Sequence, residues 1–530
     1  MLFTSIKFIV FTAILFAVYH LAPQKMRWPL LLIASGIYVV LSDDTRWVFL
    51  TCMAVTAITS WAAALWMDKI GSESDAYIKS HKEELDKAAK KALKEKTKSK
   101  KKLIMALCLL LNLGILAVTK YTDFVIENIN AVLKSEVIRP SELIVPLGIS
   151  FYTFRTVSYV IDVYRGTSKA EKNPFKVALF VSFFPQIAQG PISRWNKLSE
   201  TLFEGRRLTG SEFGSGFIRI LWGYFKKVVV ADRLVKAVLT IVGDPAQYQG
   251  IFVFAAMLFY AFELYCDFTG GIDITIGIGE CLGVKMEENF NLPYFSKSIK
   301  EYWNRWHITM GQWFTDYIFY PLSISPKMLE LSKKSRKKLG NVIGKRISVY
   351  IACFLVWLAT GIWHGPAWNF IVWGLLNFVV IMVSQELEPL YAKFHSKFGL
   401  KKHKWYGVFE ILRTFFLMGM IRMLDCYRDV PLTFRMLGTM FTGFKVRRIT
   451  DGSFLELGMS VKEYILVAVC LVVIFLVSLY KAVTKKDIRE KLVSNMPLGF
   501  AVCVILIIVT LLFGAYGHGF DTKQFIYTQF

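Results

Sequence analysis

The chain has 530 residues, of which 54% are hydrophobic and 20% are charged, and its mean hydropathy is +0.43. This apolar content exceeds what a soluble core of that size can hide, so lipid must solvate part of the chain. The formal net charge of +24 does not indicate nucleic-acid binding, because the lysines and arginines concentrate in loops between apolar runs, which is the positive-inside pattern of membrane proteins.

Nine long apolar runs are candidate membrane spans, and most of them are near the roughly 20 residues that are needed to span the hydrocarbon of a bilayer. They are Leu2–Ala22, Leu30–Leu41, Trp47–Trp66, Leu103–Val118, Ile251–Tyr265, Ile347–Ile362, Trp368–Val383, Val461–Tyr480 and Met496–Phe513. Four further runs are interrupted by Gly, Pro or charge, namely Ile144–Val163, Val177–Ile192, Phe213–Val230 and Val408–Met423. We therefore expect an all-α, polytopic transmembrane bundle with about nine to thirteen spans. The first run lacks a small-residue cleavage site, so it is interpreted as a retained helix and not as a signal peptide.

Four basic stretches set the expected orientation. Residues 68–102 hold twelve Lys against seven acidic residues, and the other stretches are Lys327–Arg346, Lys393–Lys404 and Lys481–Lys491. All four are expected to face the cytoplasm, which places the C-terminal tail outside. Within the first stretch, His81–Lys102 has a helix-forming composition without an apolar face and is interpreted as a solvated helix or arm. Docking of anionic lipid or of a partner is the alternative for this segment.

The middle third differs chemically from the two ends. Between Pro146 and Trp373 the apolar segments are dense in Gly, Pro, aromatic and charged residues. Gly and Pro release backbone hydrogen-bonding groups, and charges are costly in hydrocarbon, so such backbone must be buried in protein or line water. We therefore expect N-terminal helices over 1–144, a core of broken or re-entrant helices around a central cavity over 145–391, C-terminal helices over 392–513, and an extracytoplasmic tail over 514–530.

Two of the seven histidines, His307 and His364, lie in this core, and each follows a tryptophan. Histidine exchanges protons readily near neutral pH. Gly361, Gly365 and Pro366 break the helix at His364, and such a break makes room for a substrate. Aromatic and charged residues around the two histidines are expected to line the cavity: Trp303, Asn304, Arg305, Trp306, Trp363, Asp267 and Asp316.

Other kinds of site receive less support from the sequence. Both histidines could simply hydrogen-bond buried carbonyl groups. No metal site is expected, because the sequence has neither a His-x-x-x-His spacing nor a Cys or carboxylate cluster near them. The absence of a Walker loop, a Rossmann glycine pattern and a G-x-S-x-G elbow disfavours ATP-driven transport and a serine-hydrolase triad. A neutral imidazole in a low-dielectric cavity is a competent base toward an acceptor hydroxyl, which is the chemistry of O-acyl transfer.

Six sequence blocks follow one another through the core. They are VPLGISFYTF (145–154), SYVIDVYRG (158–166), FFPQIAQGPISR (183–194), YCDFTGGIDITIGIG (265–279), FNLPYFSKSIKEYWNRWHITMGQWFTDYIFYPL (290–322) and GIWHGPAWNFIVWG (361–374). These blocks resemble the membrane-bound O-acyltransferase (MBOAT) family, in the branch that contains the alginate O-acetylation protein and the D-alanyl transfer membrane protein. The resemblance implies an MBOAT-like catalytic core in which His364 is the catalytic histidine and His307 its supporting polar residue. The chain departs from the alginate branch after the His307 block, so the acceptor is not transferable from alginate.

The resemblance also implies a function. We expect an acyltransferase that moves acetyl groups from a cytoplasmic thioester toward a cell-envelope polysaccharide or peptidoglycan, with acetyl-CoA as co-substrate and no bound cofactor. The expected location is the bacterial cytoplasmic membrane, and an extracytoplasmic SGNH-type acyltransferase partner is expected because the outward segments are short. D-Alanyl transfer to teichoic acid is the alternative within the class. A channel or secondary transporter is the alternative from another class.

The extreme C-terminus supplies a separate clue. Residues 525–530 have the form F-x-Y-x-x-F, which resembles the tail of the small membrane peptide that accompanies D-alanyl transfer. Tyr527 is therefore a candidate acyl carrier, because a phenol hydroxyl can hold an ester once a base removes its proton. The alternative for this tail is an aromatic anchor at the membrane interface.

Overall fold

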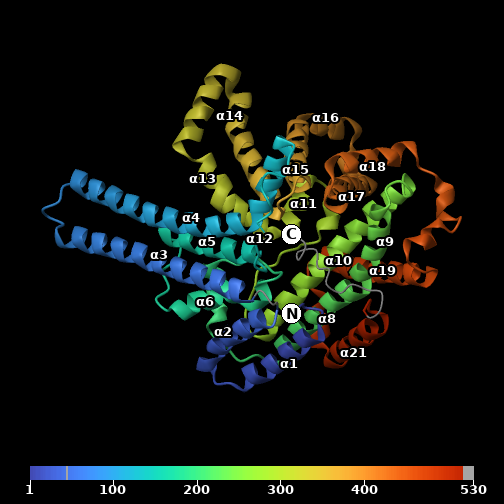
Figure 1. The fold of residues 1–530 in the computed structure, drawn as a ribbon, viewed down its shortest axis with the longest axis horizontal. Helices are drawn as coiled ribbons and strands as arrows, with labels where there is room; N and C mark the ends of the chain where they lie inside the picture. Colours follow the sequence, from blue (N-terminus) through green and yellow to red (C-terminus); the bar gives the residue numbers. More distant parts are fainter. Residues whose placement is uncertain (43–45, 142, 517–530) are drawn as a thin grey trace. The chain divides into compact units, whose positions relative to one another are not determined.

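The computed structural model describes residues 1–42, 46–141 and 143–516, and these residues fold predominantly into helices (Figure 1). The chain divides into two compact units. Unit 1 holds residues 1–213 and 278–287, and unit 2 holds residues 214–277 and the chain from 288 onward. Two helices, α8 (Gly210–Tyr224) and α10 (Ile251–Cys281), pass from one unit into the other.

Unit 1 is built from the N-terminal helices. They are α1 (Ile6–Leu21), α2 (Gln24–Val40), α3 (Arg46–Ser80), α4 (Lys87–Leu133), α5 (Ile149–Arg165), α6 (Pro174–Ser182), α7 (Trp195–Leu202) and the 3₁₀ turn η1 (Phe184–Gln186). Aromatic rings join α1, α2 and η1 in its core: Phe8 lies 6.0 Å from Tyr38, and Phe11 lies 5.4 Å from Phe184, between ring centroids. The Ser35 hydroxyl accepts the Phe184 N–H at 3.2 Å and so satisfies a buried backbone donor.

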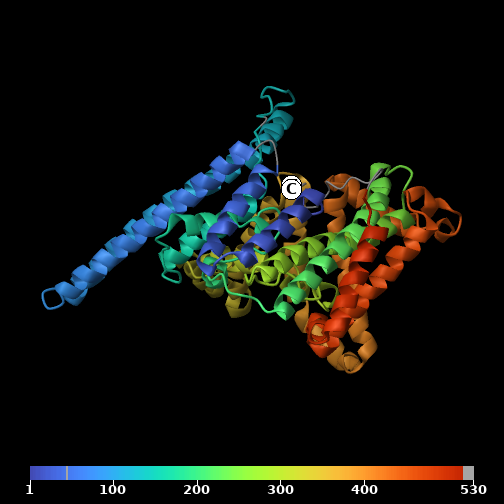
Figure 2. The same ribbon diagram turned by 90° about the horizontal axis from the view of Figure 1, so that it is seen from below.

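A long helical pair extends from the rest of unit 1. Figures 1 and 2 show α3 and α4 running side by side, joined at their far end by residues 81–86. The Asp86 carboxylate caps α4 by accepting the Ala89 N–H at 2.6 Å. The lysine-rich first part of α4 is helical and mostly exposed, as expected for a solvated arm, whereas residues 81–86 of the predicted segment form the turn before it.

Unit 2 contains the remaining helices. Its α-helices after α10 are α11 (Ile299–Arg305), α12 (Ile308–Phe314), α13 (Tyr320–Ser323), α14 (Pro326–His364), α15 (Trp368–Glu386), α16 (Glu388–Phe398), α17 (Lys404–Tyr427), α18 (Val430–Thr442), α19 (Val461–Thr484), α20 (Ile488–Ser494) and α21 (Met496–Phe513), and α9 (Asp232–Gly243) precedes α10. Two π-helical segments, η2 (Phe225–Ala231) and η4 (Thr315–Phe319), and four 3₁₀ turns, η3 (Pro293–Phe295), η5 (Leu400–Lys402), η6 (Val446–Ile449) and η7 (Ser453–Leu457), complete it. The main apolar core joins residues of η2, α9, α10, α17, α18 and α19.

Four glycines bring the backbones of α8 and α10 together inside unit 2. A Cβ atom on Gly223 would lie 2.6 Å from the Gly270 carbonyl oxygen, and one on Gly277 would lie 2.8 Å from the Gly216 carbonyl oxygen. Each pair on a helix is seven residues apart, which places both glycines on the same face. Small residues at such positions are the usual means of close helix packing in membranes. This packing fixes α10, which contacts the candidate site.

Seven helices of the described chain are long and apolar enough to cross a membrane: α3, α4, α10, α14, α15, α19 and α21. The protein is an integral membrane protein, and the expected all-α polytopic fold is confirmed. The count of long spans lies below the expected nine to thirteen for two reasons. Helices α1 and α2 are only 16 and 17 residues long. The four interrupted runs form shorter helices or helices with buried charges, such as Arg155 in α5 and Arg422 in α17.

Candidate active site

His307 lies in unit 2 at a sharp turn between α11 and α12, in the left-handed conformation with φ 49° and ψ 52°. Histidine adopts this region more often than most non-glycine residues, although the conformation is uncommon. The turn is held by a short antiparallel pairing: the Ile308 N–H donates to the Asn289 carbonyl at 2.9 Å, and the Asn291 N–H donates to the Arg305 carbonyl at 3.0 Å. The backbone at His307 is therefore fixed by long-range contacts.

Asn289 also determines which ring nitrogen of His307 carries the proton. Its Oδ1 atom accepts the Thr309 N–H at 3.1 Å and the Thr309 hydroxyl at 2.9 Å, and it lies 3.2 Å from Nδ1 of His307. A backbone N–H can only donate, so this Asn289 atom is the amide oxygen and Nδ1 must donate to it. Nε2 of His307 is then the nitrogen with the lone pair, which is the form that accepts a proton or a hydrogen bond.

The surroundings of His307 favour its neutral form. The side chain is buried, and His307 lies outside the seven candidate spans. Burial, with a smaller contribution from the positive charge of Arg422, lowers the pKa of His307 to about 3. Desolvation disfavours the charged imidazolium, so the ring stays neutral at physiological pH.

His364 is the last residue of α14, and glycines bring its helix close to α15. A Cβ atom on Gly361 would lie 2.6 Å from the Phe370 carbonyl oxygen, and one on Gly374 would lie 2.5 Å from the Trp357 carbonyl oxygen. The tight passage from α14 into α15 places the His364 ring 4.7 Å from the Trp373 ring, at an interplanar angle of 75°. Only 9% of His364 is exposed. A proton-accepting group at this position is therefore largely shielded from bulk solvent.

The indole of Trp363 contacts both histidines. Its centroid lies 5.9 Å from that of the His307 ring and 5.1 Å from that of the His364 ring. The structure thus brings the two Trp-His elements, which are far apart in the sequence, to one place in unit 2. Phe268 of α10 lies 4.9 Å from the His307 ring on another side.

A buried arginine that the sequence analysis did not identify completes this place. The Arg422 guanidinium lies over the rings of Trp303, Trp306 and Trp373, at 5.6, 5.0 and 5.2 Å from their centroids. Its Nη1 donates to Asp425 at 3.2 Å. Cation–π contacts of a desolvated guanidinium are each worth about 2 kcal/mol or more. The sequence could have indicated Arg422, because it is a charged residue inside the apolar run Val408–Met423, and such residues are retained for function or packing.

The remaining residues expected to line a cavity lie in different settings. Arg305 forms an ion pair with Glu301 at 2.6 Å. Asn304 is exposed, and Asp316 is half-buried. Asp267 adjoins Phe268 in the chain but lies 2.5 Å from the Lys227 amine, which also pairs with Asp232 at 2.6 Å. The structure thus places Trp303, Trp306 and Trp363 near the histidines and Asp267 in an ion-pair cluster.

That cluster is part of a larger set of buried charges around the π-helical segment η2. Next to Lys227, the Lys226 amine lies 2.6 Å from Asp273, and Asp273 also pairs with Arg219 at 2.9 Å. Paired charges of opposite sign are the usual state of ionisable residues at membrane depth. Their pairing supports a structural role for these residues.

Two further predictions concern a metal and Tyr527. Within the described residues, no three His, Cys, Asp or Glu side chains come together in a group that could hold a metal ion. Tyr527 lies outside the described residues.

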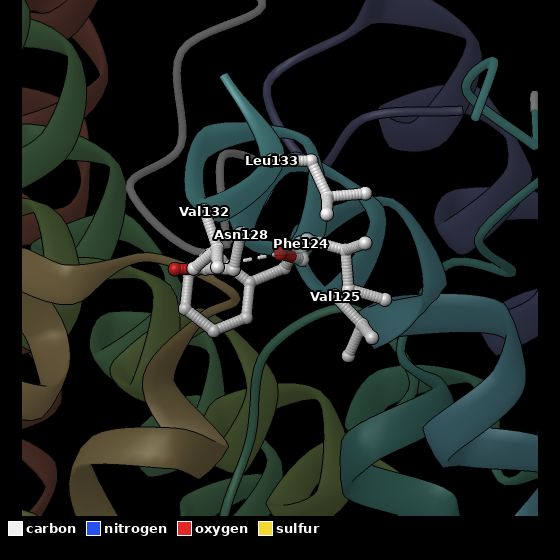
Figure 3. A pocket seen from close by; sticks show the side chains of 6 residues that line it. Phe124, Val125, Asn128, Val132 and Leu133 are labelled. Carbon is white, nitrogen blue, oxygen red and sulfur yellow. Dashed lines mark hydrogen bonds between the residues drawn. The ribbon is translucent and has the colours of Figure 1, made fainter. Parts of the chain in front are cut away.

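An apolar hollow in unit 1 is distinct from the site around the histidines. Figure 3 shows its lining, all from α4: Phe124, Val125, Asn128, Ile129, Val132 and Leu133. Asn128 turns its amide group toward its own helix and donates to the Phe124 carbonyl at 2.7 Å. Val125 and Val132 are largely exposed, as expected for a helix face in contact with lipid. The hollow offers no titratable group for acyl transfer.

Comparisons with known proteins place this site in context. The sequence profile of the membrane-bound O-acyltransferase family matches residues 169–336. The chain is 34% identical over 289 residues to a probable alginate O-acetylase of Azotobacter vinelandii, which covers 54% of each chain. It is 32% identical over 399 residues to a probable alginate O-acetylase of Pseudomonas putida, which covers 73% of this chain and 71% of the relative. It is 32% identical to a peptidoglycan O-acetyltransferase of Helicobacter pylori, covering 56% of this chain and 58% of the relative.

Proposed function

Because this chain belongs to the membrane-bound O-acyltransferase family, we propose that it moves acetyl groups from cytoplasmic acetyl-CoA toward a cell-envelope polysaccharide or peptidoglycan. The names of the relatives described above support this class of reaction, since they are O-acetylases or O-acetyltransferases of alginate and peptidoglycan. Other relatives are named teichoic acid D-alanyltransferases, which supports D-alanyl transfer as the alternative. The matched region spans about half of the Azotobacter relative, so the acetyl donor and the acceptor are part of this proposal. The observation that carries the proposal is the contact of both histidines with Trp363.

In this proposal His364 is the general base. It removes the proton of an acceptor hydroxyl, whose oxygen attacks the carbonyl carbon of the thioester. A C–O bond forms, the C–S bond breaks, and the departing thiolate takes the proton from the His364 imidazolium and leaves as the thiol. A base at a shielded position suits this step, because the acyl donor must be protected from water. His307, oriented by Asn289, is the supporting polar group.

The proposal also includes a separate partner protein and one residue of the C-terminal tail. An extracytoplasmic SGNH-type acyltransferase completes the transfer to the polymer. Tyr527 at the C-terminal tail is a candidate transient acyl carrier between the site and that partner, since its phenol can form an ester. A Tyr527→Phe variant that keeps full acetylation of the envelope in cells would contradict the carrier role and favour an aromatic anchor.

Analysis of ester-linked groups in the envelope tests the proposed reaction. Envelope polymers purified from cells that express the wild-type chain are expected to release acetate on mild base treatment. Polymers from cells without the chain are expected to release none. Release of D-alanine in place of acetate would contradict the proposed acyl group and favour D-alanylation of teichoic acid. No chain-dependent ester of either kind, despite normal insertion, would overturn the enzyme assignment in favour of a channel or transporter.

A further inference from the structure

A basic pocket lies in unit 1, between α3, α4 and the C-terminal end of α5. It has a volume of about 560 Å³, and four of its lining residues are basic: Lys94, Lys98, Lys101 and Arg165. Asp75 is the single acidic residue in its lining. The pocket therefore concentrates positive charge where three helices meet.

The three lysines share one face of α4, because they follow the spacing i, i+4 and i+7. Like charges four residues apart on a helix repel each other. Among the residues that the structure describes, no carboxylate forms an ion pair with Lys94, Lys98 or Lys101. A bound anion would relieve this repulsion, so the arrangement favours a negatively charged ligand.

The opposite wall of the pocket is shaped to admit these lysines. A Cβ atom on Gly71 of α3 would lie 3.2 Å from the Lys101 amine nitrogen, so the glycine leaves room for Lys101 to lie across α3. Beside it, the Thr97 hydroxyl donates to the Ser74 hydroxyl at 2.9 Å and links the two helices. The lysine amines and the hydroxyl groups together suit a phosphate, which accepts several hydrogen bonds.

The pocket lies at the level where the two helices leave the apolar environment. The apolar run of α4 begins at Leu103, and that of α3 ends at Trp66, close to the first acidic residue, Asp68. Lys101 and Gly71 are within about two helical turns of these boundaries, or about 10 Å along the axis. Lipid headgroups occupy this level of a bilayer, and basic pockets between transmembrane helices bind anionic headgroups.

We propose that this pocket binds the phosphate of an anionic phospholipid headgroup. The binding anchors the α3–α4 pair to the lipid surface at its base and does not depend on the proposed acyl transfer. The phosphates of a soluble ligand such as coenzyme A have the same chemistry, so the test distinguishes the two sources.

The test measures lipid binding by the purified full chain in detergent. Phosphatidylglycerol is titrated in and its retention is followed by native mass spectrometry, with phosphatidylcholine, inorganic phosphate and coenzyme A in parallel. We expect phosphatidylglycerol to bind more tightly than phosphatidylcholine. The double variant Lys98→Glu, Lys101→Glu should weaken its binding about tenfold or more, since both charges are reversed at the headgroup level.

A matched control separates the pocket from general helix charge. Lys87→Glu, Lys90→Glu makes the same charge change on the same helix, about 16 Å or more from Lys101 along its axis, and should leave binding within about twofold. Gly71→Leu fills the pocket without a charge change and should also weaken binding, whereas Ser72→Leu on its exposed neighbour should not. If the charge variants do not fold, these two leucine variants test the proposal. Equal weakening by both lysine pairs, no effect of Gly71→Leu, or displacement of the lipid by micromolar coenzyme A would overturn the proposal.

Discussion

The guanidinium carbon of Arg422 lies 5.0 Å from the centroid of the Trp306 indole, and Trp306 directly precedes His307. The same guanidinium lies 5.2 Å from Trp373, whose ring contacts His364. One buried cation on α17 thus contacts a neighbour of each candidate catalytic histidine. Through these indoles Arg422 can position both histidines.

Arg422 variants should separate this positioning from its contribution to stability. Arg422→Lys keeps the charge but loses the planar group that stacks on indoles, so we expect a lower kcat with a nearly unchanged KM. Arg422→Gln leaves the buried Asp425 without its ion-pair partner and should destabilise the protein by about 3–5 kcal/mol. Transfer rates and thermal unfolding in detergent measure the two effects.

The control for these variants is Arg413→Lys on the same helix. Arg413 is exposed and donates to the Lys297 carbonyl at 2.8 Å, so its replacement should change neither quantity. If Arg422→Lys had the kcat of the wild type, the indole contacts would have no part in positioning the histidines.

Asn289 should matter for both stability and catalysis. Asn289→Ala removes the acceptor of His307 Nδ1 and of two Thr309 donors, all of them buried. Each buried group left without a partner costs about 1–3 kcal/mol, and the His307 ring loses its fixed tautomer. We expect a clear fall in melting temperature and in transfer rate. Thr309→Val removes only one of these hydrogen bonds and should show a smaller change; equal effects of the two variants would contradict the role given to Asn289.

Gly374 should tolerate no side chain. A Cβ atom there would lie 2.5 Å from the Trp357 carbonyl oxygen, so Gly374→Ala must push α15 from α14 and displace Trp373 from His364. Overpacking of this kind costs about 1–3 kcal/mol, and thermal unfolding measures it. Gly438→Ala in α18 meets no atom within 4 Å and should be neutral or slightly stabilising. A melting temperature of Gly374→Ala equal to that of the wild type would contradict the close packing.

The low pKa of His307 predicts how stability depends on pH. Burial lowers this pKa in the folded protein to about 3, from an ordinary value of 6.5. The unfolded chain therefore takes up a proton first, so this contribution to stability is present above pH 6.5 and is lost as the pH falls toward 3. Between pH 6.5 and 5 the loss is at most about 2 kcal/mol. Melting temperatures of the wild type and of His307→Gln, measured between pH 6.5 and 5, test the lowered pKa of His307. The wild type should lose more stability than His307→Gln as the pH falls, and parallel curves would contradict the lowered pKa.

Sequence patterns were sufficient for the fold class, and they selected two histidines that the structure brings together around Trp363. Apolar runs and basic loops indicated a helical membrane protein, and the two Trp-His pairs within broken segments singled out His307 and His364. The number of spans was less predictable, because runs such as Val177–Ile192 form a short helix followed by a 3₁₀ turn. Hydropathy alone does not distinguish a span from a shorter helix buried in protein.

The partners of the histidines required the three-dimensional structure. Arg422 is far from both histidines in the sequence, and its contacts with three tryptophans depend on how α11, α15 and α17 pack. Asp267 and Phe268 of α10 show the same limit of prediction from sequence. Successive residues of a helix point in different directions, so Phe268 contacts His307 while Asp267 pairs with Lys227. Composition identifies a polar segment but not the face that meets the site.

The proposed base can be tested directly with the purified chain in vesicles. Labelled acetyl-CoA is supplied on the cytoplasmic face, and transfer of the label to a hydroxyl acceptor on the other face is measured for the wild type, His364→Ala and His403→Ala. His403 is an exposed loop histidine, so its variant should match the wild type. The account predicts that His364→Ala loses transfer by about 100-fold or more, the scale of a general base, while it inserts and unfolds like the wild type. Transfer by His364→Ala within about twofold of the wild type would contradict the assignment of His364 as the catalytic base.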